Sequence, residues 1–133
     1  PSQMQIDRLQ IVNYPHGGGE LRDHVDPRKN QRIVSGLIMS KKGIDFDNGG
    51  FYFRGKNNKK INIEDNLEVG DSVIFYGSIV HGVEKVDRDK KLDWKSYKGR
   101  WFIGMFVNES NHVKNRITAS DLSNSTNFKK RAG

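Results

Sequence analysis

Three residues, His24, Asp26 and His81, have the types and spacing of a metal-binding set. Side chains two positions apart on an extended strand point to the same side, so His24 and Asp26 can reach one point while Val25 faces away. A second histidine completes a set of two imidazoles and one carboxylate, which leaves one face of a ferrous ion open for a co-substrate and oxygen. These residues therefore predict a metal centre with His24, Asp26 and His81 as its ligands.

The surrounding sequence strengthens this interpretation, because each histidine taken alone is more often a surface or hydrogen-bonded core residue than a ligand. His24 and Asp26 end an expected strand that follows three consecutive glycines at residues 17–19. His81 opens another expected strand, which itself follows a buried one. Both ligand segments thus lie at the ends of strands.

The chain that must position these residues reads as all-β. Short apolar or alternating segments are separated by glycine, asparagine and aspartate at the spacing typical of a β-sandwich or barrel, and no helical period persists over a convincing window. The expected strands cover residues 5–14, 21–26, 32–40, 51–53, 60–63, 72–76, 81–86 and 99–107. The segments 32–40 and 72–76 are apolar enough to predict strands buried within a sheet.

Length and composition favour one compact domain. With 133 residues and 34% hydrophobic content, we expect a core at residues 1–107 and a polar, basic tail at residues 108–133. The chain has no cysteine, so a bound metal needs histidine and carboxylate ligands. Without an apolar signal region or a membrane-spanning stretch, we expect a cytoplasmic protein with no membrane association.

The charge balance is strongly basic. Lysine and arginine number 23 against 16 aspartate and glutamate residues, for a net charge of +7 and a pI near 9.7. Such a protein attracts anionic partners, including nucleic acid, although scattered charges are more often simply a solvated surface. Two basic clusters stand out, at residues 54–60 and 128–131.

Taken in order, these features resemble the Fe(II)- and 2-oxoglutarate-dependent dioxygenase superfamily, and in particular its prolyl-hydroxylase-like branch. The resemblance covers roughly residues 9–107. It is carried by Tyr14, the glycine turn 17–19, His24 and Asp26, the buried segment 33–39, Gly49 and Gly50, Gly70 and Asp71, His81, and Arg100. The fold it implies is a double-stranded β-helix, a jelly-roll or cupin-like barrel with few or no helices.

The resemblance also implies roles for individual residues. His24, Asp26 and His81 would hold Fe(II), and the Arg100 guanidinium would bind the distal carboxylate of 2-oxoglutarate, which its planar fork matches. Tyr14 would line the co-substrate pocket. Arg100 lies farther from His81 than is usual in the family, so residues 87–98 are interpreted as an insertion, with Arg88, Lys90 or Lys91 as the alternative cation.

The implied function is an oxygenase that uses O2 and 2-oxoglutarate to hydroxylate a C–H bond of a peptidyl or small-molecule substrate, with succinate and CO2 as co-products. Two alternatives follow from the positive charge. One is a catalytically inactive barrel that binds nucleic acid or another anionic partner. The other is an oxygenase acting on nucleic-acid bases, with the cluster at residues 54–60 contacting phosphates.

Overall fold

Two antiparallel sheets pack face to face in the computed structural model, which describes residues 5–110, 112–115 and 120–121. The strands are β1 (Gln5–Pro15), β2 (Leu21–Val25), β3 (Ile33–Ile38), β4 (Gly50–Arg54), β5 (Lys60–Asn62), β6 (Ser72–Tyr76), β7 (His81–Glu84), β8 (Gly99–Glu109) and β9 (Ser120–Asp121). The only helical elements in the described ranges are two short 3-10 turns, η1 (Lys56–Asn58) and η2 (Glu64–Asn66). None of the described helices could cross a bilayer.

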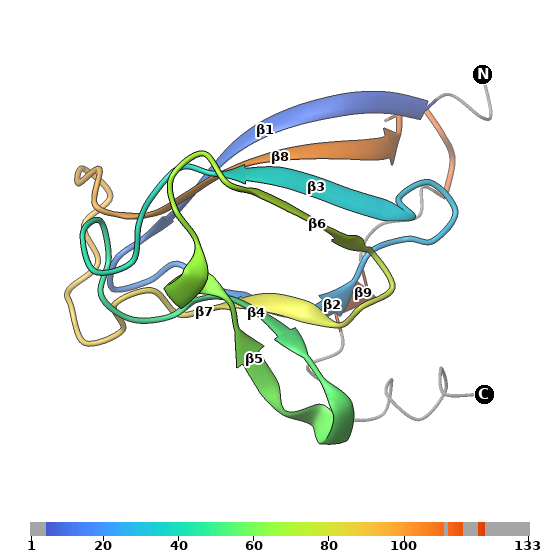
Figure 1. Cartoon of the computed structure of the whole chain (residues 1–133). Helices are drawn as coiled ribbons and strands as arrows, with labels where there is room; N and C mark the ends of the chain where they lie inside the picture. The colour runs from blue at the N-terminus through green and yellow to red at the C-terminus, as the bar shows by residue number, and fades with distance from the viewer. Residues whose placement is uncertain (1–4, 111, 116–119, 122–133) are drawn as a thin grey trace.

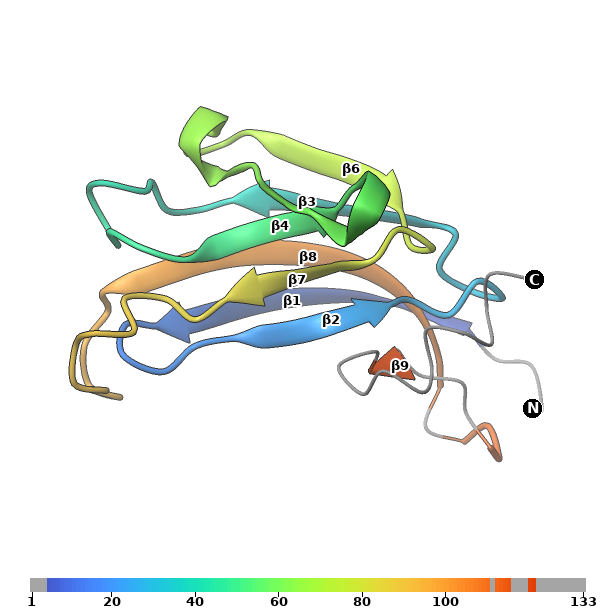
Figure 2. The same ribbon diagram turned by 90° about the horizontal axis from the view of Figure 1, so that it is seen from below.

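The order of strands is that of a jelly roll. One sheet runs β1-β8-β3-β6 and the other runs β5-β4-β7-β2-β9 (Figures 1 and 2). Successive strands of the first eight lie mostly in opposite sheets, so the chain crosses repeatedly between the layers, as in a double-stranded β-helix. The prediction of an all-β jelly-roll fold is confirmed, and every expected strand is present with its ends shifted by a few residues at most.

The core lies between the sheets. A cluster of buried side chains at its centre comprises Phe46, Phe51, Val83 and Val86, and the partly buried rings of Tyr14, Phe53 and Phe75 pack against them. In β1 and β6 the residues alternate between exposed and half-buried, as expected for strands with one face on the core.

The prediction that residues 72–76 form a buried strand is wrong for one face of β6. Ile74 and Tyr76 are both 67% exposed. The reason is that the described structure has only two layers: the outer face of the β1-β8-β3-β6 sheet is exposed on its other strands as well, with Leu9 70% and Ile33 59% exposed. A continuous apolar run predicts burial of both faces, but only neighbouring layers can provide it.

The last long strand continues beyond the end expected at residue 107. β8 continues to Glu109, and β9 adds a short strand to the free edge of β2, pairing Ser120 with Val25. The basic cluster at residues 128–131 lies outside the described residues.

The segment between β7 and β8 has no regular structure, as expected of an insertion, but it contains a buried anchor. The Asp87 side chain is fully buried and accepts hydrogen bonds from the backbone N–H groups of Asp47 and Asn48, both at 2.8 Å, and from Lys90 Nζ at 3.2 Å. Burial by itself raises the pKa of Asp87, but these hydrogen bonds outweigh it and hold the pKa below its ordinary value of 3.8. The charged carboxylate therefore joins two loops.

Asp87→Asn is expected to lower the free energy of unfolding at neutral pH by about 1 to 2 kcal/mol, because charged hydrogen bonds become neutral ones. The depressed pKa means that the carboxylate contributes fully above pH 3.8 and loses its contribution as pH falls through its folded-state pKa. Urea unfolding at a series of pH values should therefore show the gap between parent and variant narrowing below pH 3.8. Asp89→Asn, an exposed change in the same segment, serves as the control; a gap that stays constant down to about pH 2 would contradict this account.

Candidate metal centre

The three predicted ligands meet between β2 and β7. His24 lies directly opposite His81 in the antiparallel pair, and their ring centroids are 4.1 Å apart. Asp26 follows the end of β2, where its backbone N–H donates to the Gly77 carbonyl at 2.8 Å. One ligand atom from each of the three residues lies within 4.8 Å of the others. The structure therefore brings together residues that are far apart in the sequence.

A bulge in β2 helps to aim His24 inward. Leu21 pairs with Val83 and His24 with His81, so three steps along β2 match two along β7. The extra residue turns the strand so that Leu21 and His24 both line the interior, which strict alternation would forbid. This bulge could not be predicted from the sequence, because nothing in residues 21–24 marks an unpaired position.

Both imidazoles present the same nitrogen to the site. His24 Nδ1 lies 2.9 Å from the Arg22 carbonyl, and His81 Nδ1 lies 2.8 Å from the Ile79 carbonyl. A carbonyl oxygen can only accept a hydrogen bond, so Nδ1 carries the proton in each ring and Nε2 keeps its lone pair. Metal-ligating histidines are typically oriented in this way by a backbone acceptor.

The carboxylate of Asp26 is buried and has an oxygen free to bind a cation, as a metal ligand requires. Its Oδ2 atom is buried, accepts no hydrogen bond from any described group, and lies 3.5 Å from His81 Nε2. Burial raises the pKa of Asp26, although the charge of His24 works against this shift. For His81, burial and, to a smaller extent, His24 lower the pKa to about 4. His81 is thus neutral at physiological pH, and an unpaired buried oxygen beside it is costly without a cation. The residues fit a divalent metal.

The ligands line one side of a small internal cavity. Its volume is about 180 Å³, and its wall is mostly apolar. Tyr14 and Arg100, the two residues expected to bind a co-substrate, line the same cavity as the three ligands. All five predicted site residues therefore line one cavity between the sheets.

Arg100 is buried and has an acidic partner. It lies opposite Tyr14 in the β1–β8 pair, and its Nε donates to Glu64 Oε1, which also accepts from the Phe51 backbone N–H at 2.9 Å. Arg100 and Glu64 are each 2% exposed. Among the described residues, no hydrogen bond engages the two terminal nitrogens of the guanidinium.

Glu64 is the residue that sequence reasoning missed. It lies in a mostly polar stretch, residues 64–70, which the sequence predicts to be a surface turn. The alternative cations do not replace Arg100: Arg88, Lys90 and Lys91 are exposed and do not line the cavity.

Tyr14 can act as a hydrogen-bond donor in the cavity. Burial raises the pKa of its phenol, although the positive charge of Arg100 works against this shift. The hydroxyl therefore stays protonated at neutral pH, and the guanidinium carbon of Arg100 lies 5.8 Å from the ring centroid.

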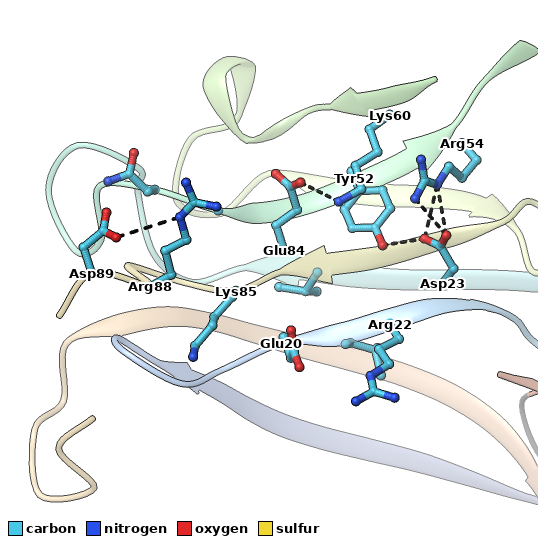
Figure 3. A pocket seen from close by; sticks show the side chains of 14 residues that line it. Glu20, Arg22, Asp23, Tyr52, Arg54, Lys60, Glu84, Lys85, Arg88 and Asp89 are labelled. Carbon is cyan, nitrogen blue, oxygen red and sulfur yellow. Dashed lines mark hydrogen bonds and ion pairs between the residues drawn. The ribbon is translucent and has the colours of Figure 1, made fainter. Parts of the chain in front are cut away.

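A second, larger hollow lies on the outer face of β2, β7 and β4 (Figure 3). It measures about 620 Å³ and is lined by charged side chains that largely pair with one another. Asp23 accepts hydrogen bonds from Tyr52 Oη at 2.5 Å and Arg54 Nη2 at 2.9 Å, and Lys60 Nζ lies 2.6 Å from Glu84. With its charges balanced in this way, the hollow has no evident preference for an anion.

Comparison with known proteins identifies no relative: no family model matches the chain, and no curated protein or solved structure matches it. Fold and site together nevertheless define a class. The protein is an all-β jelly roll with a His-Asp-His group that could hold a metal ion.

Proposed function

We propose that the protein is an Fe(II)- and 2-oxoglutarate-dependent dioxygenase of the prolyl-hydroxylase-like branch, which hydroxylates a C–H bond of its substrate. In the balanced reaction, one atom of O2 enters the new hydroxyl group and the other enters succinate, while the C1 carboxyl group of 2-oxoglutarate leaves as CO2. The observation that carries the proposal is that the ligand group and the buried Arg100 face the same cavity.

The ligand set supports iron as the metal. Two imidazoles and one carboxylate are the protein ligands typical of non-haem Fe(II) oxygenases, and they leave coordination positions open. A bound ferrous ion would supply the activation of O2, while the protein orients the reactants. The apolar wall of the cavity would keep bulk water away from them.

The position of Arg100 supports a co-substrate that binds the ligand group at one end and carries a carboxylate at the other. A molecule held at the ligand group by one end would reach Arg100 with the other, because both line the same small cavity. The terminal nitrogens of the guanidinium, which form no hydrogen bond within the described part of the chain, match a carboxylate bidentately. Tyr14 would add a neutral hydroxyl donor.

The proposal is tested by anaerobic titration of the purified protein with Fe(II) and 2-oxoglutarate. We expect a metal-to-ligand charge-transfer absorption band that saturates at one equivalent of each and disappears with a chelator. On admission of oxygen, succinate should form and can be measured by NMR. A protein that shows neither the band nor succinate would rule out this function.

A further inference from the structure

The two ends of the barrel differ in charge. Among the loops that join β1 to β8, those at the end that holds the ligand group are residues 26–32, 55–59 and 77–80, and together they contain five basic residues and one acidic residue, the ligand Asp26. The connections at the opposite end are residues 16–20, 39–49, 63–71 and 85–98, with eight basic and ten acidic residues. The loops at the metal end therefore carry an excess of positive charge, whereas those at the opposite end carry an excess of negative charge. Figures 1 and 2 show the two sets of loops at opposite ends of the strands.

Backbone hydrogen bonds place these basic loops beside the ligands. The Arg54 N–H donates to the Val80 carbonyl at 2.8 Å, which joins the start of the β4–β5 hairpin to the residue before His81. The Gly77 N–H donates to the Arg32 carbonyl at 3.0 Å, and Gly77 in turn accepts from Asp26. The two basic loops thus flank the ligand group on either side of β7.

Four cations in these loops are available to a partner. Arg28, Arg32, Lys56 and Lys59 are exposed, and none forms an ion pair with a described residue. By contrast, Arg54 in the same hairpin is held by Asp23 and by the Asn58 carbonyl. The hairpin tip is therefore fixed from inside while Lys56 and Lys59 face solvent.

The spacing of these cations favours a chain of anions over a single one. The hairpin continues β4 and the other loop continues β2, and these strands are separated by β7. Two strand spacings amount to about 10 Å, which is more than one phosphate group can bridge. A polymer with repeated phosphates can contact both loops at once.

An exposed aromatic ring favours nucleic acid over an acidic peptide. Tyr76 is 67% exposed at the end of β6, one residue before Gly77, which is hydrogen-bonded to Arg32. An accessible ring on a basic surface is an arrangement on which unpaired bases stack, and such stacking does not depend on base identity.

We infer that the substrate of the proposed oxygenase is a single-stranded nucleic acid, whose phosphates contact Arg28, Arg32, Lys56 and Lys59 and one of whose bases stacks on Tyr76. This inference rests on the proposed function and replaces the peptidyl or small-molecule substrate expected from the family resemblance. The strand would cross the metal end of the barrel, with the reacting nucleotide over the ligand group.

The inference is tested by fluorescence anisotropy with a fluorescein-labelled single-stranded 12-mer over a range of salt concentrations. In the metal-end variant, Arg28, Arg32, Lys56 and Lys59 are all changed to glutamine. We expect binding to weaken by at least about 30-fold at low salt, and the slope of log K against log salt to fall by about 3, because each phosphate contact on a single strand contributes about 0.7.

A matched variant controls for net charge. Changing Lys85, Lys91, Lys95 and Lys98 to glutamine removes the same charge from the opposite end, and we expect it to weaken binding less than about threefold. Equal losses in the two variants would overturn the inference, because they would show attraction to overall charge. A wild-type protein that binds an oligoglutamate peptide as tightly as the 12-mer would also overturn it.

The stacking contact has its own pair of variants. Tyr76→Ala is expected to weaken binding of the 12-mer about tenfold, and Tyr97→Ala, an 86% exposed tyrosine at the opposite end, should have no effect. Equal effects would overturn the role of Tyr76.

The failure of this inference can be distinguished from failure of the proposed function, because strand binding is measured without iron or 2-oxoglutarate. If the protein forms succinate but does not bind the strand, this inference alone is refuted. If it binds the strand but shows no charge-transfer band, the proposed oxygenase activity alone is refuted.

Discussion

Replacing His81 with alanine is expected to abolish iron binding and, with it, conversion of 2-oxoglutarate to succinate. His81 supplies one of three ligands, and even changes to groups that only orient a ligand commonly reduce metal affinity 10- to 100-fold. We therefore expect affinity for Fe(II) to fall by more than about 100-fold. Asp26→Ala and His24→Ala should have the same effect. Anaerobic metal titration and NMR detection of succinate measure the two consequences separately.

Two further variants make this result interpretable. His81→Gln keeps a side chain of similar length in a site that is 4% exposed, so it separates loss of a ligand from collapse of the core. His16→Ala removes a histidine that belongs to no ligand group in the described ranges and should leave iron affinity unchanged. A His81→Gln protein that is folded and binds iron as tightly as the parent would show that this group is not the metal site.

Removing Glu64 is expected to have the largest effect on stability. Glu64→Ala leaves the buried guanidinium of Arg100 without its acidic partner, and breaking one side of a buried ion pair typically costs about 3 to 5 kcal/mol. It also removes the acceptor of the Phe51 backbone N–H. Urea unfolding should show this loss in the free energy of unfolding. Glu64→Gln, which keeps an acceptor oxygen, should lose less.

A double variant separates the structural role of this pair from its proposed functional one. Glu64→Leu combined with Arg100→Met replaces both charges with apolar groups and is expected to recover most of the stability, since such exchanges are often neutral. It should still fail to bind 2-oxoglutarate, because the carboxylate has lost its cation. Glu68→Ala, which breaks an exposed pair with Lys41, is the control and should change stability by less than about 1 kcal/mol. If Glu64→Ala were as mild as this control, the buried pair would not hold the two sheets together.

Much of the fold and all of the proposed ligand group could be predicted from the sequence. Strand periodicity and turn residues are local properties, so the segment 72–76 was predicted with the bounds that β6 has in the structure. His24 and Asp26 were recognisable because their two-residue spacing already places them on one side of a strand. His81 and Arg100 were predicted from the order of motifs along the chain, because that order reflects the order of strands in this fold.

Only the tertiary structure decided which polar residues are buried and what they contact. Glu64 and Asp87 have the sequence surroundings of surface turns, yet both are almost fully buried, because other strands and loops close over them. Likewise, the loops with an excess of positive charge lie together at the metal end, because crossover between the sheets sends alternate loops to opposite ends of the barrel. The physical reason is the same in each case. Strand formation depends on neighbours in the chain, whereas burial, ion pairing and the local balance of charge depend on segments that only folding brings together.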